Sequence, residues 1–380
     1  MAVKRPLPGK GDDMKFRVSD GASFFMLGQR KTVFVESSQQ VLEVDDVTAY
    51  LTCCLAEAAS FQQLQSDLMT RGVSRTSAGG FVRKCLQFWS RQGLLDVIPE
   101  EDDGRPLYSH VVDLAGTAVS IAYYDQRLID LVLPVFDHQT ARGIQPSISY
   151  EVAKFGERVC ISRNRSRAMI VTYAEAAPAL KALLTEDVLA GVGTDVALHA
   201  AFLVKESKGL LLCGMPGAGK TTLALALAEA GFDHGGDDIA LMDGHGLVRG
   251  VPFASALKAG SWNLFPGIRD MIMSRPIHRR LDGKSVRYLA PVPDRLRDAV
   301  PLGSIVLLRR RKKGPVVVSQ AEPTRVLSEL LSGAFTPARR LNLTQFENLV
   351  SAVSRARCIE LAFSRLDDAV ETLSRQHEKE

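Results

Sequence analysis

One segment, Gly209–Met242, constrains the fold and the chemistry of this chain more than any other. Within it, the run from Gly214 to Thr221 fits the phosphate-binding pattern G-x-x-x-x-G-K-[ST] without a mismatch. Glycine lets such a loop fold tightly and turn several backbone N–H groups toward one anion. Lys220 adds a positive charge for the β- and γ-phosphates, and Thr221 offers a hydroxyl to Mg²⁺. We therefore expect nucleotide contacts from Gly214, Met215, Pro216, Gly217, Ala218, Gly219, Lys220, Thr221 and Thr222.

The residues around this loop come in the order that a phosphate site needs. Leu210–Cys213 is a short apolar run that predicts a buried strand, and Thr222–Ala230 predicts an Ala/Leu-rich helix that ends at Gly231. Strand, loop and helix in this order place phosphates at a helix N-terminus. The predicted cofactors are ATP and Mg²⁺. The structural alternative is a glycine-rich turn that only precedes a core helix.

A pair of acids, Asp237 and Asp238, follows this helix and precedes the apolar run Ile239–Met242. In ordinary P-loop ATPases the magnesium-binding acid ends a hydrophobic strand, whereas these acids come before one. We therefore expect the strand after them to run antiparallel to Leu210–Cys213, so that the acids reach the phosphates. This order argues against a GTPase or a motor ATPase, and the chain has no N-K-x-D guanine signature. The alternative is an acid pair that caps a strand in a loop.

One histidine, His199, lies in the apolar run Val196–Val204 ahead of the loop. A lone histidine in apolar surroundings is usually a core residue, and that is the alternative here. Together with Gly214–Thr221 and the acid pair, however, it gives an order of motifs that resembles the catalytic domain of HPr kinase/phosphorylase and its HPr-kinase-like relatives. Val251–Lys258 also resembles a segment of HPr-kinase-related proteins from exopolysaccharide and peptide-modification clusters. The resemblance covers the chain from about Tyr108 to Leu373.

This resemblance implies an α/β P-loop domain of the HPr kinase/PEP carboxykinase-like type, with a mixed sheet, and an ATP-dependent serine kinase activity. By analogy with the family, Asp237 is the base that takes the proton of the substrate hydroxyl. Thr221 and Asp238 then hold the metal, His199 assists in positioning, and Lys220 stabilises charge on the transferring phosphoryl group.

The chain departs from the family pattern after the acid pair. Leu247 stands where an acidic metal-binding residue would be expected, and Val248-Arg249-Gly250 is only a fragment of a longer signature. A reverse phosphorylase activity and HPr as the substrate therefore do not follow from the resemblance. The alternative to a kinase is a non-catalytic module, in which ATP binding gates the holding and release of a peptide for another enzyme. A third hypothesis, a small-molecule kinase, needs no residues before Arg105.

Residues 16–98 predict a small, separate, winged-helix-like α+β domain. We expect a hairpin formed by Ser23–Met26 and Lys31–Glu36. Three helices should follow, from Asp45 to about Ala58, over Phe61–Met69, and from Ser77 or Gly80 to Arg91. A strand at Gly93–Ile98 should close the domain. This order resembles the PqqD-like peptide-chaperone fold, chiefly at Val41–Asp46 and Gln92–Leu95. The resemblance implies a leader peptide that binds as an added strand along the hairpin edge. The alternatives are a structural, dimerising or DNA-binding winged helix.

Composition and charge divide the chain and limit its partners. We expect a disordered lead-in over 1–15, the peptide-binding domain over 16–98, a charged Pro/Gly linker over 99–106 and the kinase-like domain over 107–375. The net charge of +4 is spread along the chain and gives no case for nucleic acid, and no apolar run has membrane-spanning length. The six cysteines show no metal-site spacing, as is typical of reduced thiols in a cytosolic protein. The predicted partner is a small protein or precursor peptide, and self-association stays open.

Two basic segments follow the acid pair. Arg269, Arg275, His278, Arg279 and Arg280 surround a break at Pro276. Such a loop either grips phosphates or a substrate, or is a solvated surface. Further on, Ser304–Leu308 and Pro315–Ser319 predict a hairpin around the basic turn Arg309–Lys313, which we expect to lie in solvent.

Overall fold

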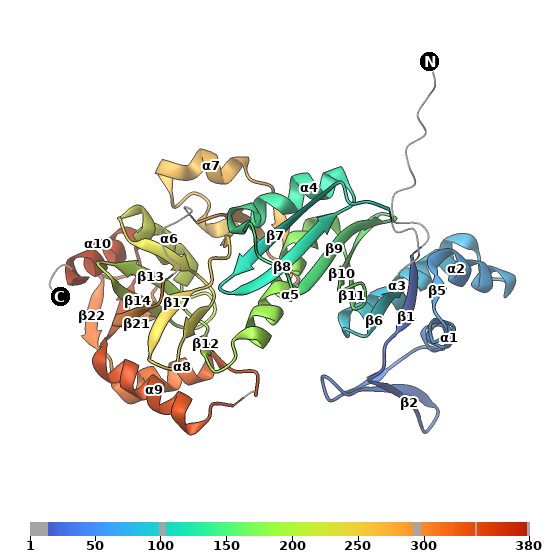
Figure 1. Ribbon diagram of the computed structural model, residues 1–380, viewed down its shortest axis with the longest axis horizontal. Coiled ribbons are helices and arrows are strands. Elements are labelled where there is room, and N and C mark those ends of the chain that lie inside the picture. The colour runs from blue at the N-terminus through green and yellow to red at the C-terminus, as the bar shows by residue number, and fades with distance from the viewer. Residues whose placement is uncertain (1–13, 99–103, 292–297, 339, 378–380) are drawn as a thin grey trace, which may run out of the picture. The chain divides into compact units, whose positions relative to one another are not determined.

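The computed structural model describes residues 14–98, 104–291, 298–338 and 340–377. Contacts divide these residues into two units. The first unit contains the described residues up to 112, together with 118–134 and 141–180. The second contains 113–117, 135–140 and the described residues from 181 onward. The mixed α/β class expected from the sequence is confirmed, since both units combine helices with sheets (Figure 1). Within the described part of the chain, no helix combines the length and apolarity that a bilayer crossing requires.

The N-terminal part of the first unit contains the hairpin, the three helices and the closing strand that the sequence predicts. Asp45 caps the first helix by accepting from the backbone N–H of Thr48, and Ser60 with Gln63 forms a capping box at the second. Two small sheets result, with strand orders β5-β1-β6 and β2-β3-β4. The elements are β1 (Lys15–Val18), β2 (Ala22–Leu27), β3 (Arg30–Val35), β4 (Gln40–Glu43), α1 (Asp46–Leu55), β5 (Ala59–Ser60), α2 (Phe61–Thr70), α3 (Arg75–Arg91) and β6 (Leu95–Ile98).

A five-stranded sheet forms the rest of the first unit, with strand order β11-β10-β9-β8-β7. In β9, Glu151 and Lys154 interrupt the apolar pattern that marks a strand in the sequence. The helix α5 begins in the first unit and continues into the second. The elements are β7 (Tyr108–Leu114), β8 (Thr117–Tyr123), α4 (Gln126–Val132), β9 (Ile148–Phe155), β10 (Arg158–Arg163), β11 (Ala168–Val171) and α5 (Ala176–Gly191).

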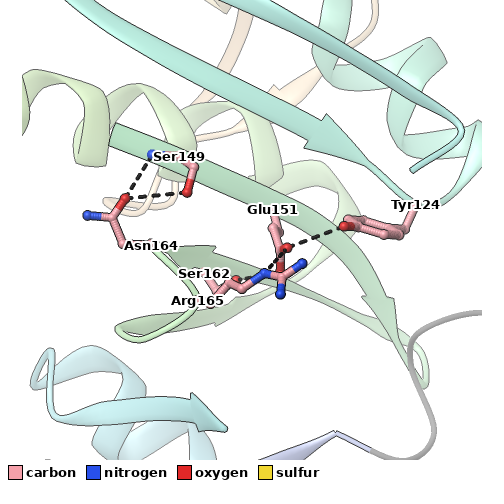
Figure 2. Close-up of polar contacts among 6 residues, drawn as sticks. All are labelled: Tyr124, Ser149, Glu151, Ser162, Asn164 and Arg165. Atoms are coloured by element: carbon pink, nitrogen blue, oxygen red, sulfur yellow. Dashed lines mark hydrogen bonds and ion pairs between the residues drawn. The ribbon is translucent and has the colours of Figure 1, made fainter. Parts of the chain in front are cut away.

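Glu151, the buried carboxylate on β9, is held by neighbouring side chains (Figure 2). It accepts hydrogen bonds from Tyr124 Oη at 3.2 Å, Arg165 Nε at 3.0 Å and Ser162 Oγ at 3.5 Å. A buried charge is tolerated when it is paired and hydrogen-bonded. This cluster therefore has a structural explanation: it fixes the turn between β10 and β11 against the middle of the sheet.

Within the first unit, the N-terminal elements pack against the five-stranded sheet. The ring of Phe155 on β9 lies 5.0 Å from that of Phe16 and 6.0 Å from that of Phe61. The backbone N–H of Ile170 donates to Ser90 Oγ on α3 at 2.7 Å. These contacts join residues 14–98 and the sheet into one apolar core. The boundary expected over 99–106 stays a prediction, and most of that linker, 99–103, lies outside the described residues, as does most of the 1–15 lead-in.

The second unit is built on a mixed sheet with strand order β15-β13-β14-β21-β17-β16-β12-β23, which β24 and β22 extend from β21. Successive residues of β14 point to opposite faces, so Leu211 packs in the core under α8 (Pro323–Ser332) and α9 (Leu343–Arg355), whereas Leu210 and Leu212 pack in the core under α6 (Lys220–Glu229) and α10 (Leu366–His377). Figure 1 shows these two pairs of helices on opposite sides of the sheet. The strands of this sheet are β12 (Val196–Leu198), β13 (Ala201–Lys205), β14 (Lys208–Cys213), β15 (Asp233–Gly236), β16 (Ala240–Met242), β17 (Leu247–Gly250), β21 (Val300–Arg310), β22 (Val317–Gln320), β23 (Ala334–Phe335) and β24 (Arg357–Phe363).

A smaller sheet of order β18-β20-β19 and several helices complete the second unit. Trp262 and Phe265, which follow β18, lie in or against an apolar cluster with Leu257 and Leu289. The remaining elements are α6 (Lys220–Glu229), β18 (Ser255–Lys258), α7 (Arg269–Ser274), β19 (His278–Arg279), β20 (Ser285–Leu289), α8 (Pro323–Ser332), α9 (Leu343–Arg355) and α10 (Leu366–His377).

The strand after the acid pair is β16, and the prediction that it runs antiparallel to β14 is wrong. β21 is parallel to β14, β17 is antiparallel to β21, and β16 is antiparallel to β17. The ladder therefore returns β16 to the direction of β14. The acids instead directly follow β15, which is antiparallel to β13, the neighbour of β14. The sequence gives little signal for β15, because Asp233-His-Gly-Gly236 contains no apolar side chain.

The hairpin predicted around Arg309–Lys313 is also wrong. β21 and β22 do not pair with each other, because β24 lies between them, parallel to β21 and antiparallel to β22. The strand β24 thus lies between the two strands that were expected to form the hairpin. A pairing between residues so far apart in the sequence cannot be predicted from the local pattern.

Candidate functional site

The loop from Gly214 to Gly219 connects β14 to α6 and depends on glycine at three positions. Gly214, Gly217 and Gly219 have φ of 145°, 93° and 98°. A Cβ on Gly214 would lie 3.0 Å from the carbonyl oxygen of Leu308. No side chain caps the start of α6, so the first backbone N–H groups of this helix remain available to an anion.

Lys220, the first residue of α6, is folded back into this loop. Its side chain is buried, and Nζ donates to the carbonyl oxygen of Gly214 at 2.7 Å. Burial lowers the pKa of Lys220 from its ordinary value, because the ammonium form loses hydration. An anion beside the loop would add a partner of opposite charge to this ammonium group.

A cavity of about 390 Å³ opens beside the loop within the second unit. Positive charge dominates its lining: five lysine and arginine side chains face two carboxylates. This balance suits a polyphosphate, which carries several negative charges in a small volume. The lining residues used below are Lys181, His199, Lys220, Thr221, Thr222, Asp237, Asp238, Lys258, Ser261, Leu264, Arg280, Arg310, Phe363 and Leu366.

Asp237 carries a carboxylate oxygen that the described protein groups leave without a partner. The residue is 5% exposed, and its Oδ1 atom accepts no hydrogen bond from the described residues. The backbone at this point is tightly fixed, because a Cβ on the preceding Gly236 would lie 2.5 Å from the carbonyl oxygen of Val251. A buried polar atom without a partner is costly, so its presence in a cavity indicates a role toward a ligand, a metal ion or a proton.

Asp238 is held from two sides. Lys181 Nζ lies 3.5 Å from Oδ2, and His199 Nδ1 lies 3.5 Å from Oδ1 and 3.1 Å from the backbone oxygen of Asp238. The charge of Lys181 lowers the pKa of Asp238, burial raises it, and His199 lowers it further, so that the net pKa lies below its ordinary value. Burial opposes the charged form of Lys181, but the carboxylates of Asp238 and Asp237 outweigh it and raise its pKa.

Sequence reasoning missed Lys181. It lies on α5 inside the apolar run from Ala176 to Leu184, where its neighbours at helical spacing are buried. A single lysine on an otherwise apolar helix was the available signal, because burying a lysine requires a charge partner.

The structure brings His199, Lys220, Thr221, Asp237 and Asp238 to the same cavity. Of the predicted phosphate contacts, Pro216, Gly217, Gly219 and Thr222 also line it. Gly214, Met215 and Ala218 do not; Gly214 and Met215 border a neighbouring cavity of about 180 Å³ that also includes His199, Pro216 and Glu329.

Residues from distant segments complete the lining. The guanidinium carbon of Arg310 lies 5.0 Å from the ring centre of Phe363, and Leu264 and Leu366 line the same cavity. Thr222 Oγ1 contacts Ser261 Oγ at 3.0 Å. Of the basic segment after the acid pair, Arg280 lines the cavity, whereas His278 is buried. Phe363 is itself buried, so the apolar surface that this part of the lining offers to a ligand comes from Leu264, which is 45% exposed, and from the half-buried Leu366.

The donor set fits a metal ion that arrives with a nucleotide. Mg²⁺ is usually held by one or two carboxylates together with substrate phosphates and water. Asp237, Asp238 and Thr221 supply oxygen donors, and one carboxylate oxygen of Asp237 has no partner in the described protein. Among the described residues, no cluster of three or more His, Cys, Asp or Glu side chains forms a closed metal site. Leu247, on β17, contributes no carboxylate.

Comparison with known proteins gives little. No family model matches the chain, and no curated protein matches its sequence. Among solved structures, the Hpr(Ser) kinase/phosphatase from Coxiella burnetii aligns with 48% of this chain and 95% of its own, at 16% sequence identity and a TM-score of 0.21. A likeness at this level does not establish a common fold, so function must be judged from the geometry of the cavity.

Proposed function

We propose that this chain is an ATP-dependent kinase that transfers the γ-phosphoryl group of Mg-ATP to a serine hydroxyl of a small protein or precursor peptide. The observation that carries the proposal is that Asp237 lines the same cavity as Lys220 and the glycine loop, and that its buried Oδ1 accepts no hydrogen bond from the described residues. A phosphate-binding loop alone would suit many nucleotide-binding proteins. The buried carboxylate beside it adds a base for an acceptor hydroxyl.

In the proposed reaction, Asp237 accepts the proton of the serine hydroxyl as Oγ forms a bond to the γ-phosphorus. The bond from that phosphorus to the β,γ-bridging oxygen breaks, and ADP leaves with the electron pair. Lys220 and the backbone N–H groups of the loop stabilise negative charge on the transferring group. A bound Mg²⁺ would neutralise phosphate charge, with Thr221 and Asp238 as its expected ligands. Lys258, Arg280 and Arg310 add positive charge around the cavity.

The N-terminal elements support a peptide as the acceptor. β2 is an edge strand, and its Phe24, Phe25, Met26 and Leu27 side chains are 49–68% exposed. An exposed apolar edge strand is a template for pairing with another chain. We propose that the precursor peptide adds a strand along β2, in the manner of a PqqD-like winged-helix domain. Tethering the peptide there would raise the effective concentration of its serine.

Location in the cytoplasm is part of the same proposal. ATP is the donor, and no disulfide joins any of the six cysteines, all of which lie in the described ranges. Disulfides are rare in reducing compartments, so thiols of this kind agree with a cytosolic enzyme.

The test is transfer of label from γ-labelled ATP with Mg²⁺ into a lysate of the source cells. Wild type is compared with Asp237→Asn and with Asp270→Asn, an exposed aspartate on α7 that serves as the matched control. We expect one small labelled species with wild type and with Asp270→Asn, and none with Asp237→Asn. Labelling by Asp237→Asn at the wild-type rate would refute the base assignment.

The alternative function is an ATP-gated peptide-binding module without catalysis, which the apolar Leu247 on β17 favours. It predicts nucleotide binding and peptide binding without label transfer. A small-molecule kinase would instead be unaffected by changes on β2. Removing residues 1–105 would expose the apolar surface that packs on the five-stranded sheet, so substitutions on β2 separate these functions better than truncation.

A further inference from the structure

We infer that Lys181 holds the place of a metal ion in the free protein. Its ammonium group pairs with the carboxylate of Asp238 there, and it turns to the terminal phosphate when metal and ATP bind together. The inference rests on the proposed function and deepens it, because it assigns a role in metal and nucleotide entry to a residue that the phosphate-binding motif does not contain.

Asp238 has a nitrogen atom beside each of its carboxylate oxygens. Its two carboxylate oxygens face nitrogen atoms of Lys181 and His199, each at 3.5 Å. The neighbouring Asp237 is 5% exposed, and its buried Oδ1 accepts no hydrogen bond from the described residues. The acid pair is therefore asymmetric: Asp238 is the more exposed carboxylate and has an ammonium group within ion-pair distance, whereas Asp237 is buried and has an oxygen without a hydrogen-bond partner.

Lys181 is buried and borders the cavity. Its side chain is only 10% exposed, yet it lines the same cavity as Lys220 and Thr221, and its ammonium lies 5.3 Å from the ring centre of Phe253. A lysine that served only to stabilise the fold would have no need to border the cavity. Asp238 keeps 44% of its side chain exposed, so the pair sits at the cavity wall and a ligand can reach it.

The consequence concerns metal entry. Two adjacent carboxylates attract a divalent cation, but an ammonium group within ion-pair distance of one of them repels it. Lys181 thus weakens metal binding to the free acid pair. When a nucleotide brings its own phosphates, the ammonium gains a new anionic partner, and Asp238 becomes available to the metal. The pair would then favour entry of the metal–nucleotide complex over entry of the metal alone.

The first test measures Mn²⁺ binding to the full chain without nucleotide, from the signal of free Mn²⁺. Lys181→Met and Lys181→Gln remove the ammonium, and Lys312→Met is the matched control that removes an exposed cation outside the cavity lining. We expect both Lys181 variants to bind Mn²⁺ about tenfold more tightly than wild type, and Lys312→Met to stay near wild type. In Lys181→Met/Asp238→Asn the gain should disappear. Unchanged or weaker Mn²⁺ binding by folded Lys181 variants would overturn the inference.

A second test does not require the Lys181 variants to fold. Asp238→Asn leaves the ammonium in place but frees it from its carboxylate. In the presence of EDTA, we expect this variant to gain about tenfold more affinity for ATP than for ADP, because Lys181 faces the terminal phosphate. Equal gains for the two nucleotides would contradict the inference. Both tests are equilibrium measurements, so a protein that binds nucleotide but transfers nothing would refute the kinase function and leave this inference to be decided on its own.

Discussion

Lys220 Nζ donates a hydrogen bond to the carbonyl oxygen of Gly214 at 2.7 Å, so the lysine near the end of the phosphate-binding pattern is bonded to the first glycine of the pattern. The bond holds the loop in shape before any ligand arrives. It also fixes the backbone of Gly214, whose φ of 145° and close approach to Leu308 leave no room for a side chain.

Gly214→Ala should therefore damage the loop. The new Cβ would lie 3.0 Å from the Leu308 oxygen, at a backbone conformation that alanine rarely adopts. We expect a loss of about 1–3 kcal/mol in the free energy of unfolding, together with weaker ATP binding. Gly217→Ala isolates the effect of this contact, because its φ of 93° is also unfavourable for alanine but its Cβ would meet nothing within 4 Å. Urea unfolding and titration with a fluorescent ATP analogue check both variants, and equal effects would show that the contact with Leu308 is unimportant.

Lys220→Met should remove phosphoryl transfer. The methionine keeps much of the apolar stem but loses the charge that faces the phosphates, and a lost charged hydrogen bond costs about 1.5–3 kcal/mol. We expect ATP affinity to fall by about tenfold or more, with a larger fall in the transfer rate. Lys312→Met, in the exposed basic turn after β21, should behave as wild type. Retention of full transfer by Lys220→Met would mean that the phosphates bind elsewhere.

His278 should make stability depend on pH. Burial lowers the pKa of this histidine to about 4 from 6.5, and its ring packs against Tyr288 with 5.3 Å between ring centres. Between these values the unfolded chain binds a proton that the folded chain does not, so stability falls as the pH drops from 6.5 toward 4. The expected contribution is about 3 kcal/mol.

The check compares urea unfolding at pH 7 and pH 4.5 for wild type, His278→Gln and His245→Gln. The glutamine at 278 should flatten the pH dependence, whereas the same change at the exposed His245 should leave it as in wild type. An identical slope in all three proteins would show that His278 is not the group responsible.

Phe25→Ser on β2 should impair the use of a peptide acceptor without affecting the chemistry. Phe25 is 57% exposed on the edge strand, so the substitution removes apolar contact area without opening a core cavity. We expect a higher KM for the acceptor at an unchanged kcat. Val317→Ser, 40% exposed on β22, is the matched change on another edge strand and should leave both constants unaltered. Equal KM values for wild type and Phe25→Ser would argue against docking on β2.

The sequence predicts best what is local. The strand at Leu210–Cys213, the glycine loop and the helix after it are consecutive, and each is specified by its own residues. The first helices were predictable for the same reason, since Asp45 and Ser60 cap them through bonds to residues three positions later. The structural consequence of the loop pattern, a glycine-dependent turn at a helix start beside a cavity, follows from these short-range signals.

Contacts between residues far apart in the chain could not be predicted from the sequence. Lys181 meets Asp238 only because α5 and the turn after β15 pack together, and no spacing rule connects residues so far apart. Arg310 and Phe363 reach the cavity because β24 inserts beside β21, a pairing that displaced the expected hairpin. β15 could not be predicted, because its four residues form a strand through pairing with β13 and not through their own strand propensity.

The measurement that tests the central claim most directly is formation of acid-stable phosphoserine from γ-labelled Mg-ATP, at equal nucleotide occupancy, by wild type and Asp237→Asn. We expect a labelled serine peptide from wild type, and a rate lower by about 10²–10⁴-fold for the asparagine variant, with ATP affinity nearly unchanged. Phosphoserine formed equally by both proteins would remove Asp237 as the base. No phosphoserine from a wild type that binds ATP would contradict the kinase assignment and favour the ATP-gated peptide-binding module.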